Sequence, residues 1–96
     1  MSDEPTFLID EDLLCKAVNK WGYEMQEIIA IEEMAELTHA IIKGKRDVKT
    51  KEKVEQVAEE IADVLIIVTQ LALCQRSSVR RAIAWKLERL KTRLEE

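Results

Sequence analysis

The sequence has little that interrupts helices, because only two glycines and one proline occur among its 96 residues. The long segments are instead rich in Ala, Leu, Ile, Glu, Lys and Arg, and most of these residue types favour helices. Hydrophobic residues make up 47% of the chain, which excludes general disorder. Nothing in the pattern is typical of a strand, a linker or a repeat, so we expect an all-α protein.

The sequence also lacks the features of several functional classes. The net charge is −4, whereas a general nucleic-acid binder normally has a basic face. No apolar segment follows Met1, and no run reaches the roughly 18–20 apolar residues of a membrane span. Cys15 and Cys74 form no CxxC pair and lie in apolar contexts, so we interpret them as buried free thiols in a reducing cytosol. We therefore expect a cytoplasmic protein that binds neither nucleic acid nor a membrane.

The chain is long enough for one modest domain. Residues 1–9 are expected to form a flexible N-terminal arm, and residues 10–96 a single helical domain. Asp10 is a suitable N-cap for the first helix, which Gly22 should interrupt. The second helix should run from about Tyr23 to Lys43 and end at Gly44 in a left-handed conformation.

Two further helices complete the expected fold. Thr50 can cap a third helix that reaches about Gln75, and Ser77 or Ser78 can cap a fourth. The apolar stripe of the fourth helix consists of Ile83, Leu87, Leu90 and Leu94. In the third helix, the segment Val64–Leu73 is apolar on nearly every face, and a single small chain cannot cover it. We therefore expect a four-helix bundle completed by homo-oligomerisation, either a dimer or a tetramer.

Two acidic motifs carry most of the functional information. Glu33 and Glu36 lie three residues apart, and so do Glu60 and Asp63, so each pair projects from one helix face. Apolar residues continue both stripes, which places the carboxylates toward the interior of a bundle. Four such carboxylates would repel one another without a cation, and an oxygen-only ligand set suits Mg²⁺ or Mn²⁺.

The combination of E-E-x-x-E on one helix and E-x-x-D on the next resembles the MazG-like, all-α nucleoside triphosphate pyrophosphohydrolases. The first motif comprises Glu32, Glu33 and Glu36, and the second Glu60 and Asp63. The wider context is also similar, with Lys-Trp-Gly ahead of the first motif and Asp-Val-Leu closing the second. The resemblance covers residues 15–94 approximately, and the paired motif is more specific than either half.

The resemblance implies Mg²⁺-dependent hydrolysis of nucleoside triphosphates to a monophosphate and pyrophosphate, in the service of nucleotide-pool housecleaning. It implies that Glu33, Glu36, Glu60 and Asp63 hold the metal, and that Glu32 contributes to a second ion or orients the attacking water. Lys86 and Arg89 match a basic element of the family's last helix and are candidate phosphate contacts, although Leu90 stands where some members carry a second arginine. Trp21 is either a base-stacking residue or a core residue at a helix end.

Three alternatives remain open at this stage. The acidic residues could form a surface ion-pair network, which their spacing alone allows. Glu36 and His39 form a Glu-x-x-His pair, the signature of ferritin-like di-iron carboxylate bundles, although His39 points about 60° away from Glu36. The chain could also be a helical interaction module without catalytic activity.

Overall fold

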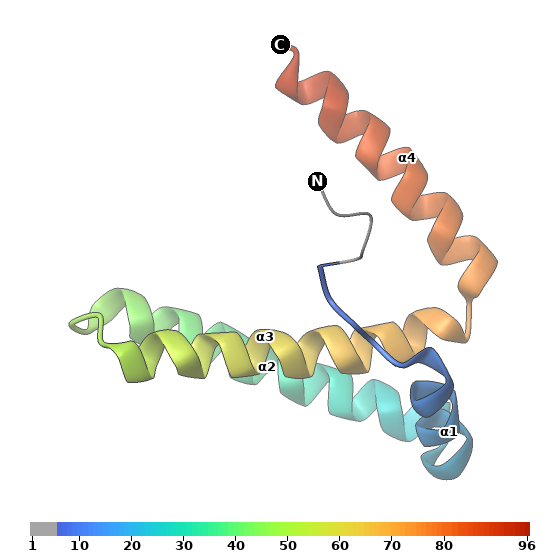
Figure 1. Cartoon of the computed structure of the whole chain (residues 1–96), viewed down its shortest axis with the longest axis horizontal. Coiled ribbons are helices and arrows are strands. Elements are labelled where there is room, and N and C mark those ends of the chain that lie inside the picture. Colours follow the sequence, from blue (N-terminus) through green and yellow to red (C-terminus); the bar gives the residue numbers. More distant parts are fainter. Residues whose placement is uncertain (1–5) are drawn as a thin grey trace.

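A computed structural model describes residues 6–96 and shows four helices and no strand in this part of the chain (Figure 1). The helices are α1 (Glu11–Trp21), α2 (Tyr23–Arg46), α3 (Lys51–Leu73) and α4 (Arg76–Leu94). The predicted all-α fold is therefore confirmed. Of the expected N-terminal arm, residues 1–5 lie outside the described residues and 6–9 are not helical, so its flexibility stays a prediction.

The predicted boundary between the first two helices is confirmed. A carboxylate oxygen of Asp10 accepts a hydrogen bond from the backbone N–H of Leu13 at 3.1 Å, which caps α1. Gly22 then separates the helices with φ +88°, a value that L-residues with side chains rarely adopt. This turn lets α1 pack across one end of the next two helices (Figure 1).

Helices α2 and α3 form an antiparallel hairpin, the main packed unit of the chain (Figure 1). As expected, Thr50 caps α3, because its hydroxyl oxygen accepts a hydrogen bond from the N–H of Lys53 at 3.2 Å. The predicted end of α2 is wrong, since the helix continues through Gly44 to Arg46. Three cations in its last turn favour this extension through the helix dipole, and Lys53 pairs with Asp47 at 3.1 Å across the connection.

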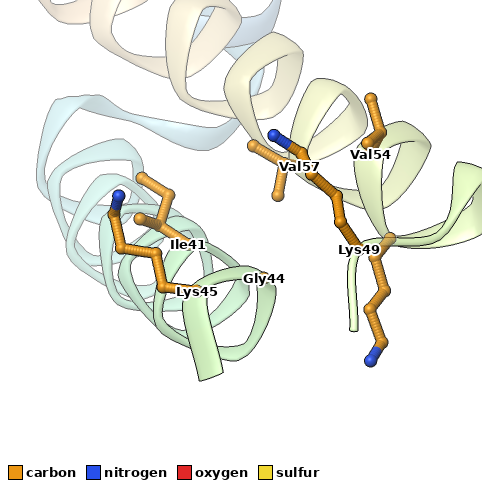
Figure 2. A pocket seen from close by; sticks show the side chains of 7 residues that line it. Ile41, Gly44, Lys45, Lys49, Val54 and Val57 are labelled. Carbon is orange, nitrogen blue, oxygen red and sulfur yellow. The ribbon is translucent and has the colours of Figure 1, made fainter. Parts of the chain in front are cut away.

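A small hollow lies at the end of the hairpin where the chain connects α2 to α3. Its floor is apolar, with Ile41 on α2 facing Val54 and Val57 on α3, and Lys45 and Lys49 stand at its edge (Figure 2). Apolar contact between the two helices therefore extends to this end of the hairpin, where lysines surround it.

Helix α4 begins earlier than expected. The chain leaves α3 at Leu73 and re-enters a helix at Arg76, with Gln75 as the N-cap residue, so the prediction that Ser77 or Ser78 caps the helix is wrong. No side chain caps the start of α4; instead, two long-range contacts fix the corner between α3 and α4. Arg76 pairs with Glu11 at 3.1 Å, and the Gln75 amide donates to the Tyr23 hydroxyl at 3.2 Å.

The core of a single chain is small. Its buried hydrophobic residues are Leu14, Ala30 and Ile67, whereas Ile66 and Val68 in the apolar segment of α3 are 43% and 41% exposed. Apart from the ion pair between Arg76 and Glu11 of α1, helix α4 packs only against α3, and it contains no buried residue (Figure 1). A single chain thus leaves α3, its most apolar helix, partly uncovered, as the sequence predicted. The oligomer that would cover this helix stays a prediction.

The two cysteines are free thiols, but only one of them is partly covered. Cys15 is half-buried, whereas Cys74 is exposed, so the prediction of burial is wrong for Cys74 in the single chain. Cys74 is the C-cap residue of α3, at the corner between α3 and α4. In the described part of the chain, no helix combines the length and the hydropathy needed to cross a membrane.

Candidate metal centre

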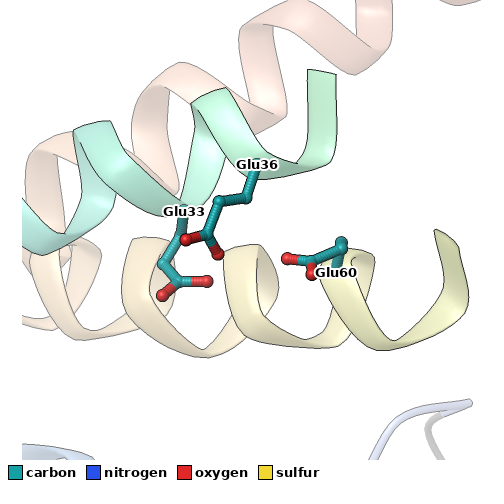
Figure 3. A group of neighbouring side chains, drawn as sticks. All are labelled: Glu33, Glu36 and Glu60. Carbon is teal, nitrogen blue, oxygen red and sulfur yellow. The ribbon is translucent and has the colours of Figure 1, made fainter. Parts of the chain in front are cut away.

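Three carboxylates converge across the α2–α3 hairpin. Glu33 and Glu36 project from α2 and Glu60 projects from α3, and one ligand oxygen from each lies within 4.8 Å of the others (Figure 3). Glu33 and Glu60 are half-buried, and Glu36 is exposed. Oxygens at these separations can share one small cation, since Mg²⁺ and Mn²⁺ take carboxylate ligands at roughly 2.0–2.2 Å.

Asp63 lies next to this group rather than within it. In the antiparallel hairpin, Glu36 lies beside Glu60, so the residue three positions earlier, Glu33, lies beside the residue three positions later, Asp63. Both of these side chains line the same cleft, and the Asp63 charge acts on Glu33. The structure therefore brings together all four carboxylates that the two motifs predicted, with Asp63 at the margin.

The electrostatics of the cluster indicate a missing positive charge. Burial raises the pKa of Glu33 above its ordinary value, and the charges of Glu36, Asp63 and Glu60 raise it further. Burial likewise raises the pKa of Glu60, with the charges of Glu36 and Asp63 adding to the effect. One buried oxygen in each of Glu33 and Glu60 has no hydrogen-bond partner. A cation bound between these carboxylates would offset their mutual repulsion and provide a partner for the buried oxygens.

The ion-pair alternative finds no support in this geometry. The salt bridges between described residues join Lys53 to Asp47 and Arg76 to Glu11, at other places in the fold. The di-iron alternative finds none either. His39 borders a hollow beside Glu36 and Glu60, but it does not belong to the three-glutamate cluster, the only group of side chains among the described residues whose ligand atoms converge closely enough to hold a metal ion.

Two other predicted site residues lie near the cluster. Glu32 is exposed on α2, adjacent to Glu33 in sequence, and is not among the three convergent carboxylates. Trp21 is 57% exposed and lines the cleft that Glu33 and Asp63 also line, so it is not a core residue of the single chain. The Nζ of Lys20 lies 5.5 Å from the centroid of its ring.

The predicted phosphate contacts do not join the cluster within one chain. Lys86 and Arg89 are on α4, where they pack over the ring of Trp85, with cation-to-centroid distances of 5.5 Å and 4.9 Å. Helix α4 makes no contact with α2 and extends away from the hairpin (Figure 1). A second subunit is therefore needed if these side chains are to reach the acidic cluster.

The structure adds two residues that the motifs did not indicate. Gln26 and Gln70 are buried, at 2% and 7% exposure, and both line the cleft beside Glu33 and Asp63. The helical periodicity of the sequence could have indicated these two glutamines. Gln26 precedes Glu33 by seven residues and Gln70 follows Asp63 by seven, which places each glutamine two turns away on the same helix face.

The comparison with protein families agrees with this geometry. The profile of the MazG nucleotide pyrophosphohydrolase domain matches residues 23–95, a segment that contains α2, α3, α4 and the complete carboxylate cluster. The chain therefore belongs to the MazG nucleotide pyrophosphohydrolase family. No curated protein and no solved structure matches the chain.

Proposed function

We propose that the protein hydrolyses nucleoside triphosphates to a nucleoside monophosphate and pyrophosphate, with Mg²⁺ or Mn²⁺ as its cofactor. The observation that carries this proposal is the convergence of Glu33, Glu36 and Glu60 within 4.8 Å, in a chain of the MazG family. Neither salt bridge between described residues involves these glutamates. The reaction breaks the anhydride bond between the α- and β-phosphates. Its role in the cell would be the removal of unwanted nucleotides from the pool.

The residues present fit a hard divalent cation. All the convergent donors are carboxylate oxygens, and two of the carboxylates keep a buried oxygen without a hydrogen-bond partner. Glu33, Glu36 and Glu60 would hold the ion, and Asp63 would complete or orient the ligand set. When bound, the cation would neutralise triphosphate charge and increase the acidity of a water molecule.

The remaining residues have supporting roles in this proposal. Glu32 is next to the ligands but exposed, so its carboxylate can accept the proton of the attacking water or contribute to a second ion. Trp21 offers an exposed ring beside the cluster, on which a base can stack. Lys86 and Arg89 contact the phosphates across a subunit interface, since α4 does not reach α2 of its own chain.

A homo-oligomer is thus part of the proposed function. The exposed apolar side chains of α3 and α4 would be covered by a second copy, and the same packing would bring the basic helix α4 toward an acidic cluster. This arrangement accounts both for the small core of the single chain and for the separation between its carboxylates and its phosphate contacts.

The test is a panel of nucleoside di- and triphosphates incubated with the protein and Mg²⁺. Monophosphate, pyrophosphate and inorganic phosphate are scored separately. We expect equal amounts of monophosphate and pyrophosphate from triphosphates, and no product in EDTA. Release of inorganic phosphate from a triphosphate would mean cleavage of the terminal bond and would contradict the proposal. Absence of any product would leave the chain as a non-catalytic interaction module.

A further inference from the structure

Two buried amides next to the carboxylate cluster lack hydrogen-bond partners. The Nε2 group of Gln26 on α2 and the Oε1 atom of Gln70 on α3 are both buried without a partner. These side chains are only 2% and 7% exposed, and burying an amide without a hydrogen bond is costly. One donor on α2 and one acceptor on α3 are therefore buried without a partner, in a protein with few buried residues.

Both glutamines line a cleft of about 500 Å³ that also reaches the metal centre. The rest of its wall is largely apolar, with Trp21 and Met25 on one side and Ile66 on the other. Glu33 and Asp63 border the same cleft. Seven residues of helix separate each glutamine from its carboxylate, a rise of about 10 Å, which is comparable with the length of a nucleoside.

We propose that this cleft holds the nucleobase of the substrate and that Gln26 and Gln70 bind its hydrogen-bonding edge. The proposal rests on the function proposed above, because a triphosphate that lies at the carboxylates places its base in the adjoining cleft. The Nε2–H of Gln26 donates to a ring nitrogen or carbonyl of the base, and the Oε1 of Gln70 accepts from a neighbouring amino or imino group.

The chemistry of the cleft selects a base over other ligands. A flat heteroaromatic ring buries its faces against Trp21 and Ile66 and presents a donor and an acceptor side by side at its edge, as the purine and pyrimidine bases do. A purely apolar ligand would leave both amides unpaired, and a sugar or a phosphate would not use the apolar walls. Gln26 and Gln70 are therefore specificity-determining residues.

Binding of the base can be measured without metal and without turnover. The chain contains two tryptophans, so Trp85→Phe leaves Trp21 as the only indole reporter. This protein is titrated in EDTA with four nucleoside 5′-monophosphates and with ribose 5-phosphate as a probe without a base. We expect saturable quenching of Trp21 by at least one monophosphate and none by ribose 5-phosphate. The absence of saturable quenching by every monophosphate would overturn the proposal.

Substitution of the glutamines separates recognition from packing. Gln26→Met and Gln70→Met keep the side-chain volume and remove the polar groups, so each should weaken binding of the preferred monophosphate about tenfold. Gln75→Met is the control for loss of an amide outside the cleft; because it also removes the hydrogen bond to Tyr23, it can lower the melting temperature but should leave the affinity for monophosphates unchanged. If the two amides serve only to pair with each other, the methionine variants will change the melting temperature but leave the affinity and the ranking of the monophosphates as they were.

One further variant, Gln26→Glu, keeps the test valid if methionine prevents folding. Gln26→Glu replaces a donor with an acceptor, so the ranking of the monophosphates should change in favour of bases that donate at that position. An unchanged ranking in a folded Gln26→Glu variant would overturn the proposal. Pyrophosphate release is measured separately, so a failure of the proposed hydrolysis and a failure of the proposed base site give different results.

Discussion

At the scale of single residues, Glu33 and Glu60 should each lower the stability of the metal-free protein while being needed for its activity. Each has a buried oxygen without a partner, near the charges of Glu36 and Asp63. Glu33→Gln and Glu60→Gln relieve this repulsion, so we expect the melting temperature in EDTA to stay constant or to rise. Pyrophosphate release with Mg²⁺ should fall at least about a hundredfold, because a ligand is lost.

The matched control for these variants is Glu55→Gln, which removes an exposed carboxylate on α3. It should change neither the melting temperature nor the activity. A loss of stability in EDTA for Glu33→Gln or Glu60→Gln, without such a loss for Glu55→Gln, would show that the buried carboxylates are structural ion-pair partners.

The same two residues predict how stability depends on pH. The pKa of Glu33 and of Glu60 is raised above 4.5, so between that value and the raised pKa the folded state binds more protons than the unfolded state. The free energy of unfolding contributed by these groups in EDTA therefore decreases as pH rises through this interval. Binding of Mg²⁺ requires the ionised carboxylates, so the stabilisation by Mg²⁺ should increase over the same interval.

Asp47 contributes to the pH dependence with the opposite sign and at lower pH. Hydrogen bonding and the charge of Lys53 lower the pKa of Asp47, so its contribution to stability is lost as pH falls. The measurement is the difference in melting temperature between the parent and the Glu33→Gln/Glu60→Gln double variant. A difference that does not vary with pH would contradict the predicted charge repulsion.

At the scale of the helices, the two glycines have opposite roles. Gly22 has a positive φ with free space around its Cα, so Gly22→Ala should cost about 1–2 kcal/mol through backbone conformation alone. Gly44 lies inside α2, also with free space, so Gly44→Ala should stabilise the protein by about 0.5–1 kcal/mol. Urea denaturation of both variants measures these changes, and equal effects would contradict the helix boundaries.

At the scale of the whole molecule, the exposed apolar face of α3 predicts an oligomer. Val68 is 41% exposed in the single chain and lies outside the cleft beside the metal centre. Val68→Asp should therefore be tolerated by a monomer, whereas in an oligomer it buries an unpaired charge and should dissociate or unfold the assembly. Light scattering at micromolar concentration gives the mass. A stable, folded monomer of the parent protein would contradict the prediction. Ile67→Asp does not discriminate, because Ile67 is buried within its own chain.

If Lys86 and Arg89 reach the carboxylates of a second subunit, two different inactive variants should restore activity when they are combined in one assembly. Lys86→Ala/Arg89→Ala chains should retain Mg²⁺ binding but lose nucleotide turnover, and Glu33→Gln chains should be inactive for lack of a ligand. Equal mixing of the two kinds of chain, refolded together, should restore about a quarter of the parental activity if the assembly is a dimer, because half of the dimers are mixed and each has one complete site. No recovery on mixing would place Lys86 and Arg89 outside the site or in the same subunit as their carboxylates.

The sequence by itself determined what depends on near neighbours in the chain. Helical periodicity placed Glu33 beside Glu36 and Glu60 beside Asp63, and local hydrogen bonding made Asp10 and Thr50 caps. The paired motif also identified the family, which the domain profile confirmed. The tertiary structure decided which carboxylates converge, that Gln26 and Gln70 are buried next to them, and that α4 leaves its own hairpin. These features depend on the register between α2 and α3 and on the corner at Gln75. Both are set by contacts between residues far apart in the sequence, which local patterns do not encode.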